Sequence, residues 1–355
     1  CVCVCVCVYV CMFFFSFSFS LSFRTLPFFF FCFLLPTRKA NPPTVPTHPL
    51  THKQENMTDI ALCTIISGSF IGSIYVWPKE YRFARLCIKN LKEASRDGPH
   101  RVIRDDLSTI RRRMVSFVGA TGMSMLLLEH LLRKEPGECQ MLLGSSLLRY
   151  IICSERSISQ SMVQVAETGV ATLLLFIGPF LEGVRFPRWS ETDHIIFIRN
   201  YILAPFGEEM FFRALLLYLL RRRPVVSSIV ISSIFFALCH THHIFTIAAE
   251  ECQIATELNE PHTDVLIYWK RAAGNLTGVL GCTFVYGLLG GYCYTIVCAK
   301  NILATILFHS ICNMLGPPPL HFISEGSPRK RTVRAIVYVA GIVGWAFVLS
   351  KMRRR

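Results

Sequence analysis

Three charged residues lie within one otherwise apolar stretch of the sequence, APFGEEMFFRALLL. In a membrane helix, a charge near the bilayer centre is costly unless it is paired or faces water. Glu209 and Arg213 are four residues apart and share a helical face, whereas Glu208 is turned about 100° away from that face. We therefore interpret Glu209 and Arg213 as an ion pair and Glu208 as the carboxylate that can do chemistry. Pro205 and Gly207, just before them, would loosen the helical hydrogen bonds and could admit water.

Imidazole and amide groups occur in two further apolar stretches. SSIFFALCHTHHIF places His240 at the end of a run, with His242 and His243 in the following loop. ILFHSICNMLG places His309 and Asn313 four residues apart, on one helical face. Each group has a structural interpretation, because a single His or Asn in a membrane is more often an interhelical hydrogen bond and an i, i+4 Glu–Arg pair is often only a satisfied ion pair. For His242 and His243 the structural interpretation is that they are ordinary interfacial loop residues.

Considered together, two Glu, an Arg, two separate His and an Asn on three helices form an acid–base set with an oxyanion donor. Peptide hydrolysis needs such a set, because it requires a proton acceptor for the attacking water and a hydrogen-bond donor for the developing oxyanion. The predicted catalytic residues are Glu208, Glu209, Arg213, His240, His309 and Asn313.

The elements that must position these groups are membrane helices. The 355 residues are 52% hydrophobic and only 17% charged, with a mean hydropathy of +0.44, which is too apolar for an ordinary soluble domain. The net charge of +14 favours loops beside anionic lipid over nucleic acid as the reason for the basicity. We expect an all-α polytopic membrane protein with about eight transmembrane helices enclosing a catalytic cavity. The apolar runs lie near residues 58–77, 114–132, 163–184, 195–220, 224–240, 274–298, 301–315 and 332–349.

The first residues differ in character from the rest of the chain. CVCVCVCV and FFFSFSFSLSF are alternations that nucleotide repeats encode, and the first Met with a good membrane span behind it is Met57. We predict that residues 1–56 are translated non-coding sequence outside the fold, and that 57–355 form a single membrane-embedded domain. A signal or transit segment is the alternative, but a basic start and a small-residue cleavage site are missing. Of 16 Cys, six precede Met57, and the remaining ten (16 − 6) include no CxxC pair for a zinc ribbon or redox site.

At the charged and polar positions the sequence resembles the Rce1-type CAAX prenyl proteases, a glutamate-dependent intramembrane endopeptidase family. Phe236 with His240 fits the FxxxH motif of this family, and His309 with Asn313 fits its HxxxN motif. Its APxxEExxFR pattern is matched by Ala204, Pro205, Glu208, Glu209, Phe212 and Arg213. Three motifs in order on three membrane helices make the resemblance specific, and it spans roughly residues 57 to 320.

The resemblance implies a hydrolase of the endoplasmic reticulum membrane. Such an enzyme removes the last three residues that follow a farnesylated or geranylgeranylated Cys, so its partners are prenylated CAAX proteins and the lipid bilayer, without nucleic acid. Carried over to this chain, Glu208 with His240 would activate the attacking water. His309 with Asn313 would hold the tetrahedral oxyanion, and Glu209 paired with Arg213 would orient the catalytic glutamate.

Two alternatives stay open on the residues. Glu208, His240 and His309 carry the oxygen and nitrogen ligands of a zinc site, although the HExxH signature is absent. The resemblance favours a cofactor-free mechanism. Other functional classes are a related membrane protease acting on non-prenylated peptides and a non-enzymatic scaffold or transporter, for which we find no internal repeat.

Overall fold

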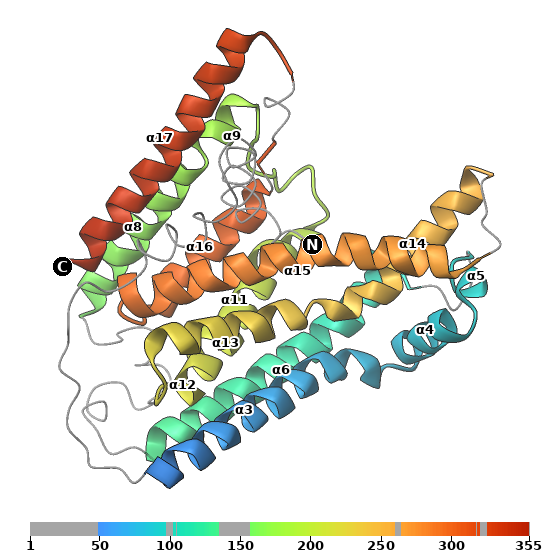
Figure 1. Cartoon of the computed structure of the whole chain (residues 1–355), viewed down its shortest axis with the longest axis horizontal. Coiled ribbons are helices and arrows are strands. Elements are labelled where there is room, and N and C mark those ends of the chain that lie inside the picture. Colours follow the sequence, from blue (N-terminus) through green and yellow to red (C-terminus); the bar gives the residue numbers. More distant parts are fainter. Residues whose placement is uncertain are drawn as a thin grey trace.

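The computed structural model describes residues 49–96, 102–103, 105–134, 157–259, 264–316, 318–319 and 325–354. Within these ranges the chain forms helices and no strand, which confirms the all-α prediction (Figure 1). The first helix, α3, spans Pro49–Gly72, so helical structure begins eight residues before Met57. Residues 1–48 of the predicted non-coding segment 1–56 lie outside the described residues, so the prediction for that segment stays a prediction.

The N-terminal part of the fold is a pair of long helices joined by short ones. Beside α3 runs α6, Leu107–Lys134 (Figure 1). Between them lie η1 (Ser73–Val76), α4 (Pro78–Lys89) and α5 (Leu91–Ala94). Ser116 links α6 to the segment that follows α3. Its hydroxyl accepts a hydrogen bond from Trp77 Nε1 at 2.8 Å and donates one to the Ser73 carbonyl oxygen at 2.8 Å.

The start of α6 is held by carboxylates outside its apolar part. Asp106 accepts a hydrogen bond from the Thr109 backbone N–H at 3.1 Å, as an N-terminal cap does. The hydroxyl of Ser108, followed by that backbone N–H, holds the pKa of Asp106 below its usual value. Farther along α6, Arg112 Nε forms an ion pair with Glu80 Oε1 of α4 at 2.9 Å. These contacts fix which face of α6 turns toward the rest of the molecule.

The centre of the fold is formed by α13 (Val225–Leu238), η4 (Thr241–His243), α14 (Ile244–Glu257) and α15 (Leu266–Tyr292). Figure 1 shows α13 lying along α15. Their close approach depends on Gly287, where a Cβ would lie 2.8 Å from Ser233 Cβ. Toward the C-terminus, α16 (Ile302–Leu315) and α17 (Pro328–Arg353) both pack against α8 (Ile158–Leu175), which is followed by α9 (Ile177–Leu181).

The helix that carries the charged motif is not uniform. In order along the chain it consists of α10 (His194–Ile198), η2 (Arg199–Leu203), α11 (Ala204–Glu209), η3 (Met210–Leu216) and α12 (Leu217–Leu219), and both η2 and η3 are π-helical. Pro205 has no N–H to donate, and the π-helical stretch ends just before it. The loosening expected from Pro205 therefore takes the form of a wider helix, and such segments frequently occur at functional sites.

The expected count of eight membrane spans is not confirmed. Five helical stretches in the described part of the chain are long and apolar enough to cross a membrane: Asp59–Val76, Leu107–Arg133, Val225–Glu257, Leu266–Val297 and Pro328–Arg353. The expected run 301–315 corresponds to α16, which has only 14 residues. The run 163–184 is divided at Phe176 into α8 and α9, and the run 195–220 alternates between α- and π-helix. In the described part of the chain, the apolar runs of the sequence therefore do not correspond one to one with long continuous helices.

Candidate active site

A cavity of about 210 Å³ lies where these elements meet. Its wall is formed by the end of α3 with η1, one face of α6, the segment η2–α11–η3, the turn after α13 with η4, two residues of α15 and one of α16. The six predicted catalytic residues fall into two groups. Glu208, His240 and Asn313 line the cavity. Behind this wall, with fully buried side chains, lie Glu209, Arg213 and His309.

Glu209 is the centre of the buried group. Arg213 Nε lies 3.2 Å from Glu209 Oε2, which is the i, i+4 ion pair expected from the spacing. His309 Nδ1 lies 2.9 Å from Glu209 Oε1, and the Tyr286 hydroxyl donates to the same oxygen at 3.4 Å. Three elements other than α11 thus hold this one carboxylate: η3, α15 and α16. Tyr286 belongs to no motif, and no sequence pattern singled it out.

His309 lies between the two adjacent glutamates. In addition to its contact with Glu209, its Nε2 lies 3.8 Å from Glu208 Oε2. The resemblance implied that His309 and Asn313 together hold an oxyanion. In the structure only Asn313 of these two lines the cavity, whereas His309 is fully buried against the carboxylates. This geometry suits positioning of Glu208 by His309.

Asn313 reaches across to the motif-bearing helix. Its Nδ2 donates to the Asn200 carbonyl oxygen of η2 at 3.1 Å. An amide nitrogen carries two N–H groups, so this bond and a bond to an oxyanion are compatible. Asn200 also lines the cavity and was not predicted from the sequence. Its carbonyl belongs to the π-helical segment η2, which ends just before Pro205. Pro205 was the local sequence signal for an irregular helix at this point.

His240 has its tautomer set by the FxxxH spacing. Its Nδ1 lies 2.8 Å from the Phe236 carbonyl oxygen, one helical turn earlier. A carbonyl can only accept, so Nδ1 carries a proton, and in a neutral ring Nε2 would be the basic nitrogen. His242 bonds the Cys239 carbonyl in the same way at 2.8 Å. Both His242 and His243 line the cavity, so they are not only the ordinary loop residues of the structural interpretation.

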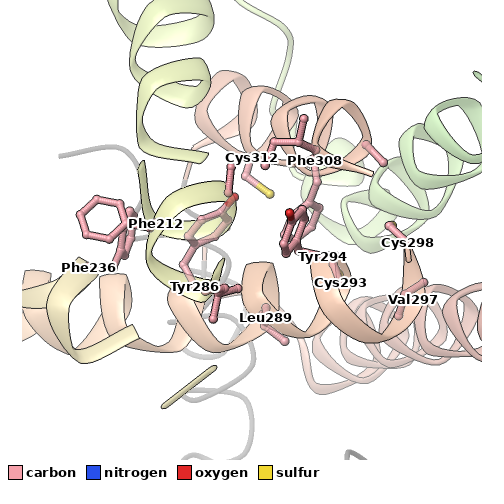
Figure 2. Close-up of a cluster of buried hydrophobic side chains, with 14 of the residues drawn as sticks. Phe212, Phe236, Tyr286, Leu289, Cys293, Tyr294, Val297, Cys298, Phe308 and Cys312 are labelled. Atoms are coloured by element: carbon pink, nitrogen blue, oxygen red, sulfur yellow. The ribbon is translucent and has the colours of Figure 1, made fainter. Parts of the chain in front are cut away.

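Aromatic rings surround the buried ion pair. The guanidinium carbon of Arg213 lies 4.9 Å from the centre of the Phe236 ring and 5.8 Å from that of Tyr286, as in cation–π contacts. Figure 2 shows Phe212, Phe236 and Tyr286 in the buried cluster, where Phe212 meets Phe236 edge to face. On the other side, Gly290 of α15 allows the guanidinium to approach the backbone, since a Cβ there would lie 2.8 Å from Arg213 Nη2.

The side chains proposed as alternative zinc ligands do not converge on one point. A zinc site needs three or more ligands within about 2 Å of one ion. Across the part of the chain that the structure describes, no group of three or more His, Cys, Asp or Glu residues has such an arrangement. Glu208, His240 and His309 thus do not fit zinc as they stand, and we derive no step through a metal.

Comparisons with known proteins identify the same family as the three motifs. A family model described as "Type II CAAX prenyl endopeptidase Rce1-like" matches residues 190–315. The chain is 25% identical to CAAX prenyl protease 2 of Homo sapiens over 293 residues, which cover 77% of this chain and 74% of the human protein. It is 26% identical to CAAX prenyl protease 2 of Rattus norvegicus over 274 residues, or 72% of this chain and 68% of the rat protein.

CAAX prenyl protease 2 of Saccharomyces cerevisiae is 27% identical over 177 residues, which cover 45% of this chain and 51% of the yeast protein. No solved structure matches the chain significantly. The matched range 190–315 contains every motif position from Ala204 to Asn313. The resemblance seen in the three motifs is thereby confirmed: the chain is similar to the Rce1-like type II CAAX prenyl endopeptidases over residues 190–315 and to CAAX prenyl protease 2 of three organisms.

Proposed function

We propose that this protein is an intramembrane endopeptidase that removes the C-terminal three residues of prenylated CAAX proteins. The observation that carries the proposal is the position of Glu208, which lines the cavity while its neighbour Glu209 is held behind the wall by Arg213 and His309. One carboxylate is thus presented to a substrate, and the other maintains the helix packing.

In the proposed reaction, Glu208 and His240 activate a water molecule in the cavity. The water oxygen attacks the scissile carbonyl while its proton passes to Glu208, whose side chain is 17% exposed. His240 Nε2 accepts a hydrogen bond from the same water, which the tautomer set by Phe236 permits. The proton then moves from Glu208 to the leaving amine as the tetrahedral intermediate collapses, so the carboxylate is regenerated.

The negative charge that develops on the scissile carbonyl oxygen needs a hydrogen-bond donor in the cavity wall. We assign this role to the Asn313 amide, which lines the cavity and does not titrate. His309 acts as a positioning residue, because its two ring nitrogens contact the two adjacent carboxylates. Glu209 and Arg213 keep α11 and η3 in register with α16, so they support Glu208 without touching the reacting atoms.

The substrate class follows from the surroundings of the cavity. Apolar side chains make much of its wall, including Phe70, Phe117, Leu203 and Val279. A prenyl chain gains free energy by leaving water for such apolar surface or for the adjoining lipid. We expect the protein to reside in the endoplasmic reticulum membrane, as the family resemblance implies.

A peptidase assay on membranes containing the full chain tests this proposal. Farnesylated and non-farnesylated C-terminal peptides of the same sequence are compared, and products are identified by mass. We expect loss of the last three residues from the farnesylated peptide only. Equal cleavage of both peptides would indicate a membrane protease that ignores the prenyl group. No cleavage of either would refute the enzymatic assignment.

A further inference from the structure

Among the charged residues that line the cavity, positive side chains outnumber negative ones. Two guanidinium groups, those of Arg113 and Arg199, are part of its wall. Among the described residues that line it, Glu208 is the only acidic one. A mainly apolar cavity with this balance favours a ligand that brings a negative charge, because a buried anion needs a cation within hydrogen-bonding distance.

The two arginines lie on different walls and differ in their surroundings. Arg199, in η2, has Nη2 2.8 Å from Asp105 Oδ1 and Nε 2.9 Å from Asn200 Oδ1, so its guanidinium is anchored to the wall. Arg113 comes from α6, where the face made by Ile110, Arg113, Met114 and Phe117 turns toward the cavity. His242 and His243 of η4 line the same cavity.

The level of Arg113 relative to Glu208 follows from the packing of α6 against α11. A Cβ on Gly207 would overlap the Phe117 ring and would lie 2.7 Å from Thr121 Oγ1, so Phe117 sits directly beside the residue that precedes Glu208. Arg113 is four residues before Phe117, or about 6 Å along the helix axis. Glu208 and Arg113 thus face the same cavity with a gap of more than one helical turn.

A CAAX substrate, which we take from the proposed function, brings a matching anion. Its free terminal carboxylate lies three residues beyond the bond to be cleaved, or about 10 Å in an extended chain. Arginine suits a carboxylate because its planar group can donate two parallel hydrogen bonds. We propose that Arg113 is a specificity-determining residue that binds the C-terminal carboxylate of the substrate. Its separation from Glu208 sets the number of residues that are removed.

The test compares two farnesylated peptides that differ only at the C-terminus, one with a free carboxylate and one with a carboxamide. The proteins are the full chain in membranes as wild type, Arg113→Gln, Arg113→Lys and Arg111→Gln. Arg111 is the matched control, because it lies on the same helix but is exposed outside the cavity. Abundance in the membrane is measured for each variant, and the readout is the acid-to-amide ratio of kcat/KM.

We expect wild type and Arg111→Gln to prefer the acid by about 10-fold to 100-fold, the effect of hydrogen bonds to a charged group. In Arg113→Gln the ratio should fall toward one, through a higher KM for the acid peptide. Arg113→Lys keeps the charge but loses the two-pronged contact, so its ratio should lie between these values.

Two results would overturn the inference: a wild-type enzyme that cleaves acid and amide equally, or an Arg113→Gln protein that keeps the wild-type ratio. If Arg113→Gln is too scarce to assay, Arg113→Lys with an unchanged ratio would count in the same way against bidentate binding. The proposed function fails separately, and the inference with it, if the wild type cleaves neither peptide.

Discussion

His309 Nδ1 lies 2.9 Å from Glu209 Oε1, a contact between residues 100 positions apart in the chain. Through it, α16 is tied to the carboxylate that the i, i+4 spacing had already assigned to Arg213. The opposite ring nitrogen of His309 lies on the side of Glu208, at 3.8 Å. Glu208 is therefore backed by a buried imidazole whose own position depends on Glu209.

Glu208→Gln separates chemistry from binding. Glutamine keeps the size and the hydrogen bonding of the side chain but cannot accept a proton from water. We expect turnover to fall by at least about 10²- to 10⁴-fold, the usual contribution of a general base. Membrane abundance and binding of a farnesylated peptide should stay near wild type. Glu257→Gln is the control, because Glu257 is exposed at the end of α14. A Glu208→Gln enzyme with normal turnover would exclude Glu208 as the base.

The buried ion pair should matter for stability as well as for activity. Glu209→Ala or Arg213→Ala leaves the other charge buried at 0% exposure, which costs on the order of 3–5 kcal/mol. Both single variants should therefore be scarcer in the membrane and less active, and the double variant should be more abundant than the sum of the two losses predicts. The exposed pair Arg188–Glu191 serves as the comparison, where alanine should change abundance little. A stable and active Arg213→Ala protein would contradict the role of this pair.

Gly290 provides a test of the same pair from a neighbouring helix. In Gly290→Ala the new Cβ would lie 2.8 Å from Arg213 Nη2 and 3.0 Å from Nε, so the guanidinium must shift from its place beside Glu209. We expect activity to fall about tenfold or more, as it does when buried polar groups lose alignment. Gly278→Ala on the same helix meets no atom within 4 Å and should leave activity unchanged. Equal activity of the two variants would show that the site tolerates the shift.

Substitutions of Asn313 distinguish a role as an oxyanion hydrogen-bond donor from a role as a metal ligand. Asn313→Ala should lower kcat by about 10²- to 10³-fold with little change in KM, because the hydrogen bond forms mainly in the transition state. Asn313→Asp should be worse still, since its negative charge would face the developing oxyanion. If position 313 instead bound a metal, aspartate should be tolerated, because a carboxylate is the better ligand. Steady-state kinetics on the farnesylated peptide decide between these outcomes.

Chelation addresses the metal question directly. The side chains of Glu208, His240 and His309 are not arranged around one point, so we expect activity to survive prolonged treatment with a zinc chelator. The control is a second sample to which zinc is added back after chelation. Activity that disappears with the chelator and returns with zinc would replace the glutamate mechanism with a metal-dependent one.

Sequence spacing was sufficient to predict the contacts that are made within one helix. The Glu209–Arg213 pair and the His240–Phe236 hydrogen bond both join residues four apart, and a helix brings such residues together whatever surrounds it. The exposure of Glu208 toward the cavity agrees with its rotation away from that pair. Composition likewise predicted an all-α membrane protein, because a helix makes all its backbone hydrogen bonds within one apolar segment.

Contacts between helices were decided only by the tertiary structure. His309 contacts Glu209, Tyr286 contacts the same carboxylate, and Asn313 contacts the Asn200 carbonyl, each from a different helix. The periodicity of one helix does not specify its rotation against another, which depends on close approaches such as those at Gly207 and Gly290. For the same reason the apolar run near 114–132 that the sequence predicts leaves Arg113 just outside it, whereas packing of α6 against α11 makes Arg113 part of the cavity wall.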